Sequence, residues 1–164
     1  MPDVKLKRPD GTWVSLVGPQ GGAGIQGIQG PAGPALVSAS ANLVANVTMT
    51  NANTFYDGPV LALAAGTWML FATLTAGRAA TGATAYTARI SDGTTHYAST
   101  QFSQASLNPH VVSLTIVSPP IVLVAPATIK AQCAANVASS IIYAAATVNG
   151  AGNNASHIRA LKIA

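Results

Sequence analysis

Charged residues are scarce in this sequence. Only 7% of its 164 residues carry a charged side chain, whereas an average soluble domain has about 25%. There is no glutamate, and the four acidic residues are Asp3, Asp10, Asp57 and Asp92. Hydrophobic residues make up 49% of the chain, which is the opposite of the composition of a disordered protein. We therefore expect part of the surface to be buried between subunits, because the core of a self-association interface is depleted in charge.

Basic residues are also few, and they are spread along the chain. There are eight Lys and Arg, and the net charge is +4. A nucleic-acid-binding protein concentrates such residues on one face or stripe. The closest approach to a cluster is Lys5, Lys7 and Arg8, and acidic Asp3 and Asp10 lie beside it. We expect no nucleic-acid partner.

The sequence contains one cysteine and no long apolar stretch of the kind that forms a membrane-spanning helix. The single Cys133 excludes a disulfide within one chain, and we interpret it as a small buried hydrophobic residue. Residues 1–17 lack the apolar region of a secretory signal, so we expect none. The uncharged stretches 59–76 and 111–129 contain glycine or proline and do not resemble a spanning helix of about 20 apolar residues. We expect no membrane insertion.

The sequence offers little for catalysis. Asp57 and Asp92 both precede glycine, a context in which aspartate is chosen for turn geometry. No nucleophile motif Gly-x-Ser-x-Gly and no phosphate-binding loop is present. The remaining metal-ligand types lack zinc-motif spacing: His96, His110, His157 and Cys133. We expect no catalytic residue, no cofactor and no metal site, and so no enzyme. A ring of symmetry-related histidines on a threefold axis stays open.

Residues 18–35 contain the sharpest pattern, a glycine at every third position. These glycines are Gly18, Gly21, Gly24, Gly27, Gly30 and Gly33. Three polyproline II chains can meet on one axis only if every third residue lacks a side chain, and Pro19, Pro31 and Pro34 favour that conformation. The pattern predicts a collagen-like triple helix, with a flexible linker as the alternative. Because the run is short, we expect the following domain to drive trimerisation.

Residues 1–17 form a short leader. Its turn signal Pro9-Asp10-Gly11 separates two alternating segments, 4–7 and 12–16, which predicts a hairpin. Two strands alone are marginally stable in water, so the leader needs further copies or a partner surface. Trp13 and Arg8 are the candidate attachment residues. Alternatively, Trp13 packs on its own hairpin.

Residues 36–164 form a head in which every strong signal is β. The predicted strands are 67–75, 85–90, 94–98, 111–117, 121–124, 127–134, 141–148 and 157–163, with one or two more in 36–49. Asp92-Gly93 between alternating runs predicts a hairpin. Some eight to ten short strands without an amphipathic helix predict a sandwich, jelly roll or barrel.

Two features of the head bear on its contacts. Residues 141–146 are apolar or small on both faces of the predicted strand, so we expect neighbouring subunits to cover the second face; an aggregation-prone strand is the alternative. Ligand binding belongs on exposed loops, and the candidates are 78–83, 101–110 and 149–154. Tyr97 and Phe102 near one loop could stack on sugars, but we expect both to pack inside the sandwich.

A collagen-like Gly-X-Y stem followed by an all-β head resembles the architecture of C1q and tumour necrosis factor, whose jelly-roll heads form tight trimers and nucleate the stem. Segments 46–59 and 63–68 resemble the first strands of such heads in bacteriophage virion proteins, and 155–163 resembles their last strand. Residues 7–13, running directly into the Gly-X-Y stem, also look like phage tail and virion proteins.

The resemblance implies a homotrimer with an all-β jelly-roll sandwich head, a short triple helix and an N-terminal hairpin. It implies a structural virion protein, made in the host bacterial cytoplasm. In the tail-associated version, a fibre or minor tail protein is held by other virion proteins through residues 1–17 and displays its head to a host glycan or receptor. A trimeric capsid decoration protein is the alternative. A glycan-degrading head would need paired carboxylates in a cleft. The receptor-binding residues are unknown from sequence.

Overall fold

The structure is a computed structural model that describes residues 4–15, 22, 24, 26–27, 30, 36–105, 110–148, 151–154 and 156–163. The chain divides into two units, residues 1–34 and 35–164. Of the stem glycines, Gly18, Gly21 and Gly33 lie outside the described residues. A Cβ added at Gly24, Gly27 or Gly30 would meet no atom within 4 Å of this single chain. The collagen-like triple helix stays a prediction.

The leader contains the predicted hairpin. Strand β1 (Lys5–Lys7) pairs antiparallel with β2 (Trp13–Ser15). In the turn, the Arg8 N–H donates to the Thr12 carbonyl oxygen and the Gly11 N–H donates to the Arg8 carbonyl oxygen. The carboxylate of Asp10 accepts from the Thr12 backbone N–H at 3.0 Å. The prediction of a hairpin at Pro9-Asp10-Gly11 is thus confirmed. The hairpin leaves Trp13 62% exposed, with the Lys7 ammonium 5.9 Å from its ring centroid.

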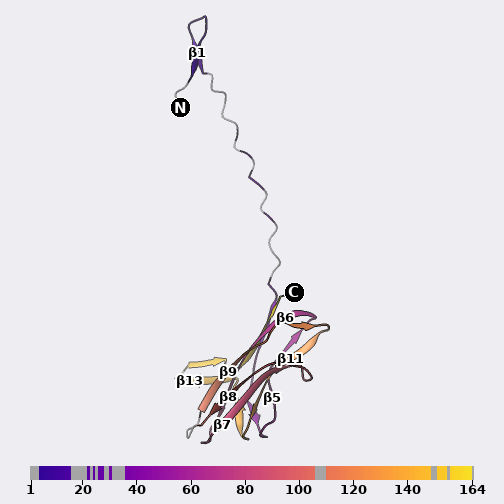
Figure 1. Ribbon diagram of the computed structural model, residues 1–164. Coiled ribbons are helices and arrows are strands. Elements are labelled where there is room, and N and C mark those ends of the chain that lie inside the picture. The colour runs from indigo at the N-terminus through magenta and orange to yellow at the C-terminus, as the bar shows by residue number, and fades with distance from the viewer. Residues whose placement is uncertain are drawn as a thin grey trace. The chain divides into compact units, whose positions relative to one another are not determined.

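The head is built from strands, and its described residues contain no helix (Figure 1). No helix in the described chain is therefore long and apolar enough to cross a membrane. The strands are β3 (Ser38–Asn42), β4 (Val47–Met49), β5 (Tyr56–Leu63), β6 (Gly66–Arg78), β7 (Thr84–Ser91), β8 (His96–Gln104), β9 (His110–Val117), β10 (Ile121–Leu123), β11 (Ala127–Ala135), β12 (Ser140–Ile142), β13 (Ala145–Val148), β14 (Ala151–Asn154) and β15 (His157–Lys162). The all-β prediction is confirmed.

The strands form two main sheets with jelly-roll pairing. One sheet contains β3, β15 and β6, with β9 and β10 on one edge of β6 and β12 and β4 beside its C-terminal part. The other has the order β5-β11-β7-β8. The antiparallel pairs are nested: β3 with β15, β5 with β11, β6 with β9 and β10, and β7 with β8. A long hairpin rolled across two sheets in this way is a jelly roll.

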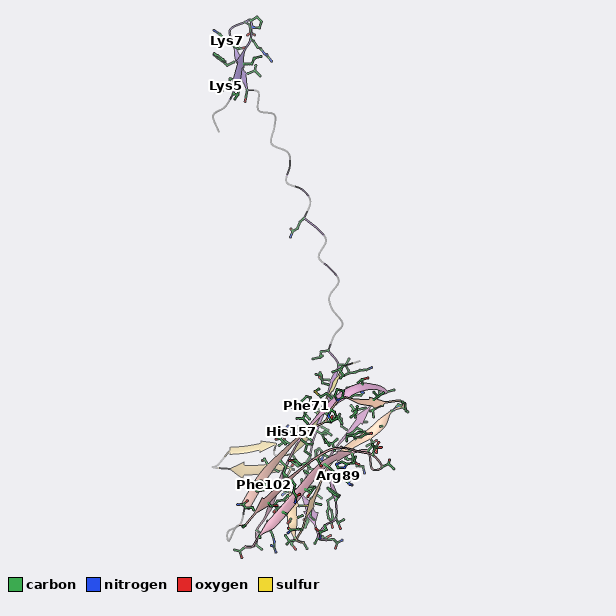
Figure 2. All side chains as sticks on the ribbon, viewed as in Figure 1. Lys5, Lys7, Phe71, Arg89, Phe102 and His157 are labelled. Atoms are coloured by element: carbon green, nitrogen blue, oxygen red, sulfur yellow. The ribbon has the colours of Figure 1, made fainter. Side chains whose placement is uncertain are left out.

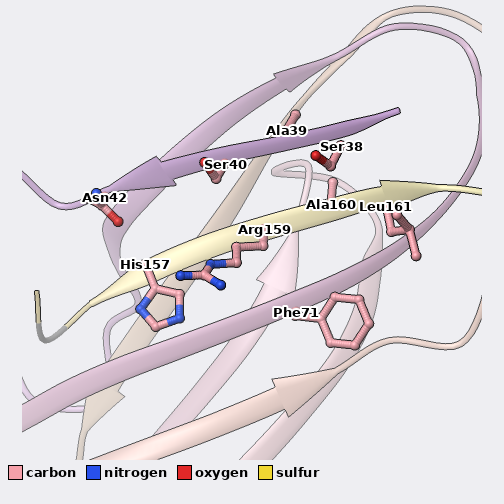
Figure 3. Close-up of a pocket in the computed structure, with 9 residues that line it drawn as sticks. All are labelled: Ser38, Ala39, Ser40, Asn42, Phe71, His157, Arg159, Ala160 and Leu161. Carbon is pink, nitrogen blue, oxygen red and sulfur yellow. The ribbon is translucent and has the colours of Figure 1, made fainter. Parts of the chain in front are cut away.

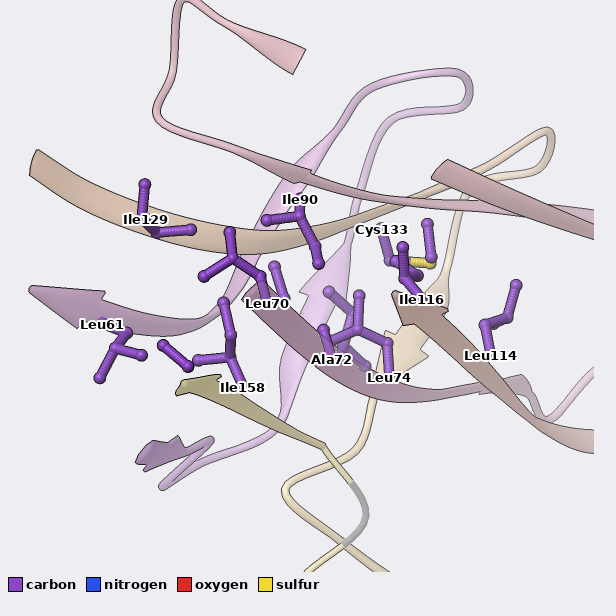
Figure 4. Close-up of a cluster of buried hydrophobic side chains, with 14 of the residues drawn as sticks. Leu61, Leu70, Ala72, Leu74, Ile90, Leu114, Ile116, Ile129, Cys133 and Ile158 are labelled. Atoms are coloured by element: carbon purple, nitrogen blue, oxygen red, sulfur yellow. The ribbon is translucent and has the colours of Figure 1, made fainter. Parts of the chain in front are cut away.

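The core lies between these two sheets. Alternate residues along the strands are buried, as in the pattern of β7, because successive side chains of a strand point to opposite faces. Figure 4 shows side chains from both sheets meeting there, among them Leu70, Ile90, Ile129 and Ile158. Cys133 belongs to this core, as predicted, and burial raises the pKa of its thiol to about 12.

Strand β6 is 13 residues long and has partners along both edges. One edge pairs with β10 and then β9, and the other with β15 and then β12. Two buried serines bridge the gaps between successive partners. The Leu70 N–H donates to the Ser118 hydroxyl, and the Thr75 N–H donates to the Ser156 hydroxyl, both at 3.0 Å. These hydroxyls satisfy buried backbone donors that no strand reaches.

The predicted turn at Asp57-Gly58-Pro59 is wrong, because these residues lie inside β5. The register between β5 and β11 shifts so that Gly58 and Pro59 lie opposite Ala131 alone, which is a β-bulge. Proline lacks a backbone donor and is tolerated at a bulge. A Cβ on Gly58 would stand 2.9 Å from the Ala131 carbonyl oxygen, so only glycine fits there without movement. The turn residues therefore mark a bulge.

The structure also corrects several boundaries in the head. The predicted strand 141–148 is two strands, β12 and β13, and β12 lies in the sheet between β6 and β4 with Ile142 fully buried. The idea of one long strand with two apolar faces is thus wrong. Candidate loops 101–110 and 149–154 contain strand residues of β8, β9 and β14, and residues 106–109 and 149–150 lie outside the described chain. In the loop 78–83, Arg78 ends β6.

The serine bridges yield a test of the fold. We expect Ser118→Ala to lower the free energy of unfolding by about 1–3 kcal/mol, because the Leu70 N–H would be left buried without its acceptor. Urea unfolding followed by circular dichroism at fixed protein concentration measures this. Ser99→Ala, at an exposed position of β8, should stay within about 0.5 kcal/mol of wild type. Equal effects of the two substitutions would contradict the role given to Ser118.

Candidate functional site

The two outer faces of the sandwich differ in chemistry. We call the outer face of the first sheet the β6 face. Its outward-pointing residues alternate with core residues along the strands. On β3, β6, β9, β10 and β15 they are Ser38, Ser40, Asn42, Met69, Phe71, Thr73, Val111, Ser113, Thr115, Val117, Val122, His157, Arg159 and Leu161. This set holds hydroxyl and apolar side chains, one amide, one arginine, one histidine and no carboxylate.

The part of the β6 face on β9 and β10 exposes the valines Val111, Val117 and Val122, with the hydroxyl side chains of Ser113 and Thr115 between the first two. Val117 is 54% exposed and Val122 is 70% exposed. Val117 lies opposite Phe71 in the register of β9 with β6, so the apolar surface of the valine is next to that of Phe71. Scattered exposed valines are normal, but the apolar strip that Val117, Val122 and Phe71 form carries no charge, as the core of a protein contact does.

The part on β3 and β15 is hollowed. A depression of about 560 Å³ is lined by Ser38, Ala39, Ser40, Asn42, Phe71, His157, Arg159, Ala160 and Leu161. Figure 3 shows the Arg159 and His157 side chains next to each other on β15. The strand register places Arg159 between Ser40 and Phe71, and His157 between Asn42 and Thr73.

The hollow is electrically positive. Partial burial lowers the pKa of His157, and the positive charge of Arg159 lowers it further. Within the described part of the chain, Arg159 forms no ion pair and no hydrogen bond with another side chain. The Arg159 guanidinium therefore has no counter-charge among the described residues of the head and is available to an acidic group of another molecule.

The outer face of the second sheet is polar, and its charges are paired. The Asp57 carboxylate accepts from the Lys130 ammonium and from the Gln132 amide, both at 2.6 Å, and Gln132 in turn accepts from the Arg89 guanidinium at 2.8 Å. Burial alone would raise the pKa of Asp57, but these hydrogen bonds and the neighbouring positive charges outweigh it and lower the pKa. The Arg89 guanidinium also stacks 3.8 Å from the Phe55 ring centroid. Arg89 belongs to β7 of this sheet and is labelled in Figure 2.

Asp92 acts as the turn residue that the sequence predicts. Its carboxylate accepts from the Tyr97 hydroxyl at 2.6 Å and from the backbone N–H groups of Thr94 and Thr95. These hydrogen bonds hold the pKa of Asp92 well below its usual range. Both head carboxylates therefore have structural partners, and both lie away from the outward-pointing set of the β6 face.

The structure places the other predicted residues as follows. Tyr97 packs against the core, but Phe102 is 43% exposed, so the expectation that both pack inside is wrong for Phe102. Phe102 lies on β8, the edge strand of the β5-β11-β7-β8 sheet, where the inner face of the sheet is incompletely covered. His96 is exposed at the start of β8. Among the described residues, no three His, Cys, Asp or Glu side chains are grouped to hold a metal ion.

Sequence reasoning missed the hollow on the β6 face. A signal was present, because Met69, Phe71 and Thr73 alternate with the core residues of the same strand. Their meeting with Arg159 depends on β15 pairing directly with β6, and residue order alone does not predict which distant strands are neighbours. Figure 2 shows Phe71 and His157 in the same region of the head.

No protein-family model and no curated protein matches this sequence. Among solved structures, a chain from the structure of infectious bursal disease virus, Gt strain, aligns with a TM-score of 0.39 and 11% identity, covering 96% of this chain and 45% of that chain. This chain thus spans less than half the length of the viral chain. The C-terminal CBM6 of LamC, a marine laminarinase from Zobellia galactanivorans, aligns with a TM-score of 0.30 and 10% identity, covering 77% of this chain and 100% of that chain. Likenesses this weak carry no functional argument.

The charge repulsion between Arg159 and His157 in the hollow yields a test. We expect Arg159→Gln to raise the pKa of His157 toward its usual value, leaving it still depressed because burial remains. An NMR pH titration of the His157 ring protons measures the change. Lys162→Gln removes the same charge from the same strand but does not line the hollow, and it should leave the titration unchanged. An unaltered His157 pKa in Arg159→Gln would contradict the described geometry.

Proposed function

We propose that this chain is a homotrimeric structural protein of a bacteriophage virion, associated with the tail and displaying its head for host-surface attachment. The observation that carries the proposal is the glycine at every third position of residues 18–35, immediately before a jelly-roll head. Only a triple helix gives that period a physical reason. The resemblance of segments 46–59 and 155–163 to phage virion heads supports the virion location.

The β6 face is the part of the head best suited to contact other subunits. Its strip around Val117 and Val122 is exposed and apolar, whereas the second outer face carries the paired charges of Asp57, Lys130 and Arg89. In the proposed trimer, the part of the first face around Val117 and Val122 turns toward neighbouring copies, and the part on β3 and β15 and the second face turn toward water. This arrangement explains how a chain with so few charged residues stays folded and dispersed.

The leader serves as the attachment segment to other virion proteins. Its hairpin exposes Trp13 and keeps Lys7 over the ring, so an aromatic anchor with a cationic neighbour is available to a partner pocket. Arg8 at the turn adds a second cation. Each head would bind a host glycan or receptor weakly, and several trimers on one particle would bind strongly through avidity.

A capsid decoration protein is the second candidate. The same trimer, placed at threefold positions of a shell, would stabilise the particle, and the head would need no ligand. The exposed apolar strip of the β6 face fits either location, because both need only subunit contacts. A glycan-degrading activity is not proposed, since Asp57 and Asp92 are each held by structural hydrogen bonds.

Labelling of purified virions separates these locations. We expect gold-labelled antibody against residues 36–164 to mark the tail, and we expect particles lacking this head to lose host adsorption. Adsorption is measured by counting free particles after mixing with cells. Label on the shell, together with normal adsorption and a less heat-stable capsid, would favour decoration. Virions that carry no label would contradict both versions of the proposal.

A further inference from the structure

We infer that the hollow on the β6 face binds an oxyanion, such as a sulfate, a phosphate or a carboxylate. Five side chains that can donate hydrogen bonds line it: Ser38, Ser40, Asn42, His157 and Arg159. Within the described residues, none of the five is hydrogen-bonded to another side chain. A concave site lined by hydrogen-bond donors and one unpaired cation is complementary to a negatively charged oxygen group.

Arg159 holds the centre of the site. It projects from β15 between Ser40 on β3 and Phe71 on β6, so two neighbouring strands fix its surroundings. A guanidinium presents a planar fork of donors that matches two oxygens of one anion. Ser40 lies opposite Arg159 on β3 and Phe71 lies opposite it on β6, and the guanidinium is directed toward His157 (Figure 3).

The charge balance of the head favours an external anion. The outward-pointing set of the β6 face contains no carboxylate. The two head carboxylates are engaged elsewhere, Asp57 with Lys130 and Asp92 with Tyr97. Beside Arg159 the nearest titratable neighbour is His157, and Asn42, Ser40 and Thr73 on the flanking strands carry no charge. A bound anion would neutralise Arg159 and stabilise a protonated His157 at the same time.

The size of the hollow extends the range of ligands beyond an inorganic ion. At about 560 Å³ it falls within the usual range of small-molecule pockets, roughly 300–1,000 Å³. A sugar acid could place its carboxylate on Arg159 and its ring against Phe71. The oxyanion therefore has two possible sources, a free inorganic ion or an acidic sugar of a host polysaccharide. The inference holds for a monomer as well as for the proposed trimer.

An NMR titration of the full-length chain tests the site. Sodium sulfate is added at constant ionic strength, with sodium chloride as the balancing salt, and the His157 ring resonances are followed. We expect a saturable change and a rise in the pKa of His157. Affinity should fall about tenfold or more in Arg159→Gln, because a charge-assisted pair is lost. Lys162→Gln should bind as wild type does, and circular dichroism checks that both variants are folded.

A second arm compares sodium glucuronate with neutral glucose. Tighter saturable binding of glucuronate than of sulfate would assign the site to an acidic sugar, and binding of sulfate alone would assign it to an inorganic ion. Glucose should bind in neither case. Linear, equal shifts in wild type, Arg159→Gln and Lys162→Gln with every salt would overturn the inference.

Discussion

The backbone of β6 must form hydrogen bonds along both edges, and the head is organised around that requirement. Thirteen consecutive residues in one strand exceed what a single short partner can pair. Two strands therefore share each edge, and Ser118 and Ser156 bridge the donors that fall between them. Because β15 is one of these partners, it lies beside β6, the third of the nested strands, which closes the jelly roll.

The same strand sets the chemistry of the outer surface. Its inward residues join the core, and its outward residues Met69, Phe71 and Thr73 lie between the valines of β9 and the Arg159 side of β15. One strand thus contributes to both the apolar strip and the hollow. The few charged residues of the head are unevenly distributed over its surface. Asp57, Lys130 and Arg89, with their hydrogen-bonded partners, all lie on the other sheet.

Much of the fold could be predicted from local signals. Pro9-Asp10-Gly11 and Asp92-Gly93 form the expected turns because their geometry is set within a few residues. Asp57-Gly58-Pro59 has a similar composition but forms a bulge, because its conformation is set by pairing with β11, a strand distant in the sequence. The hollow could not be predicted for a related reason. It joins Ser40 to Arg159, and their contact follows from strand order rather than from any motif.

The central claim is that the chain assembles as a trimer whose heads contact each other through the part of the β6 face around Val117 and Val122. The most direct measurement is native mass in solution for the full-length chain, residues 36–164 and the full-length Val117→Asp variant, with Val60→Asp on the other sheet as control. We predict three-chain assemblies for the first two and for Val60→Asp, and dissociation of Val117→Asp because a buried contact would receive an unpaired charge. A monomeric full-length chain would contradict the account.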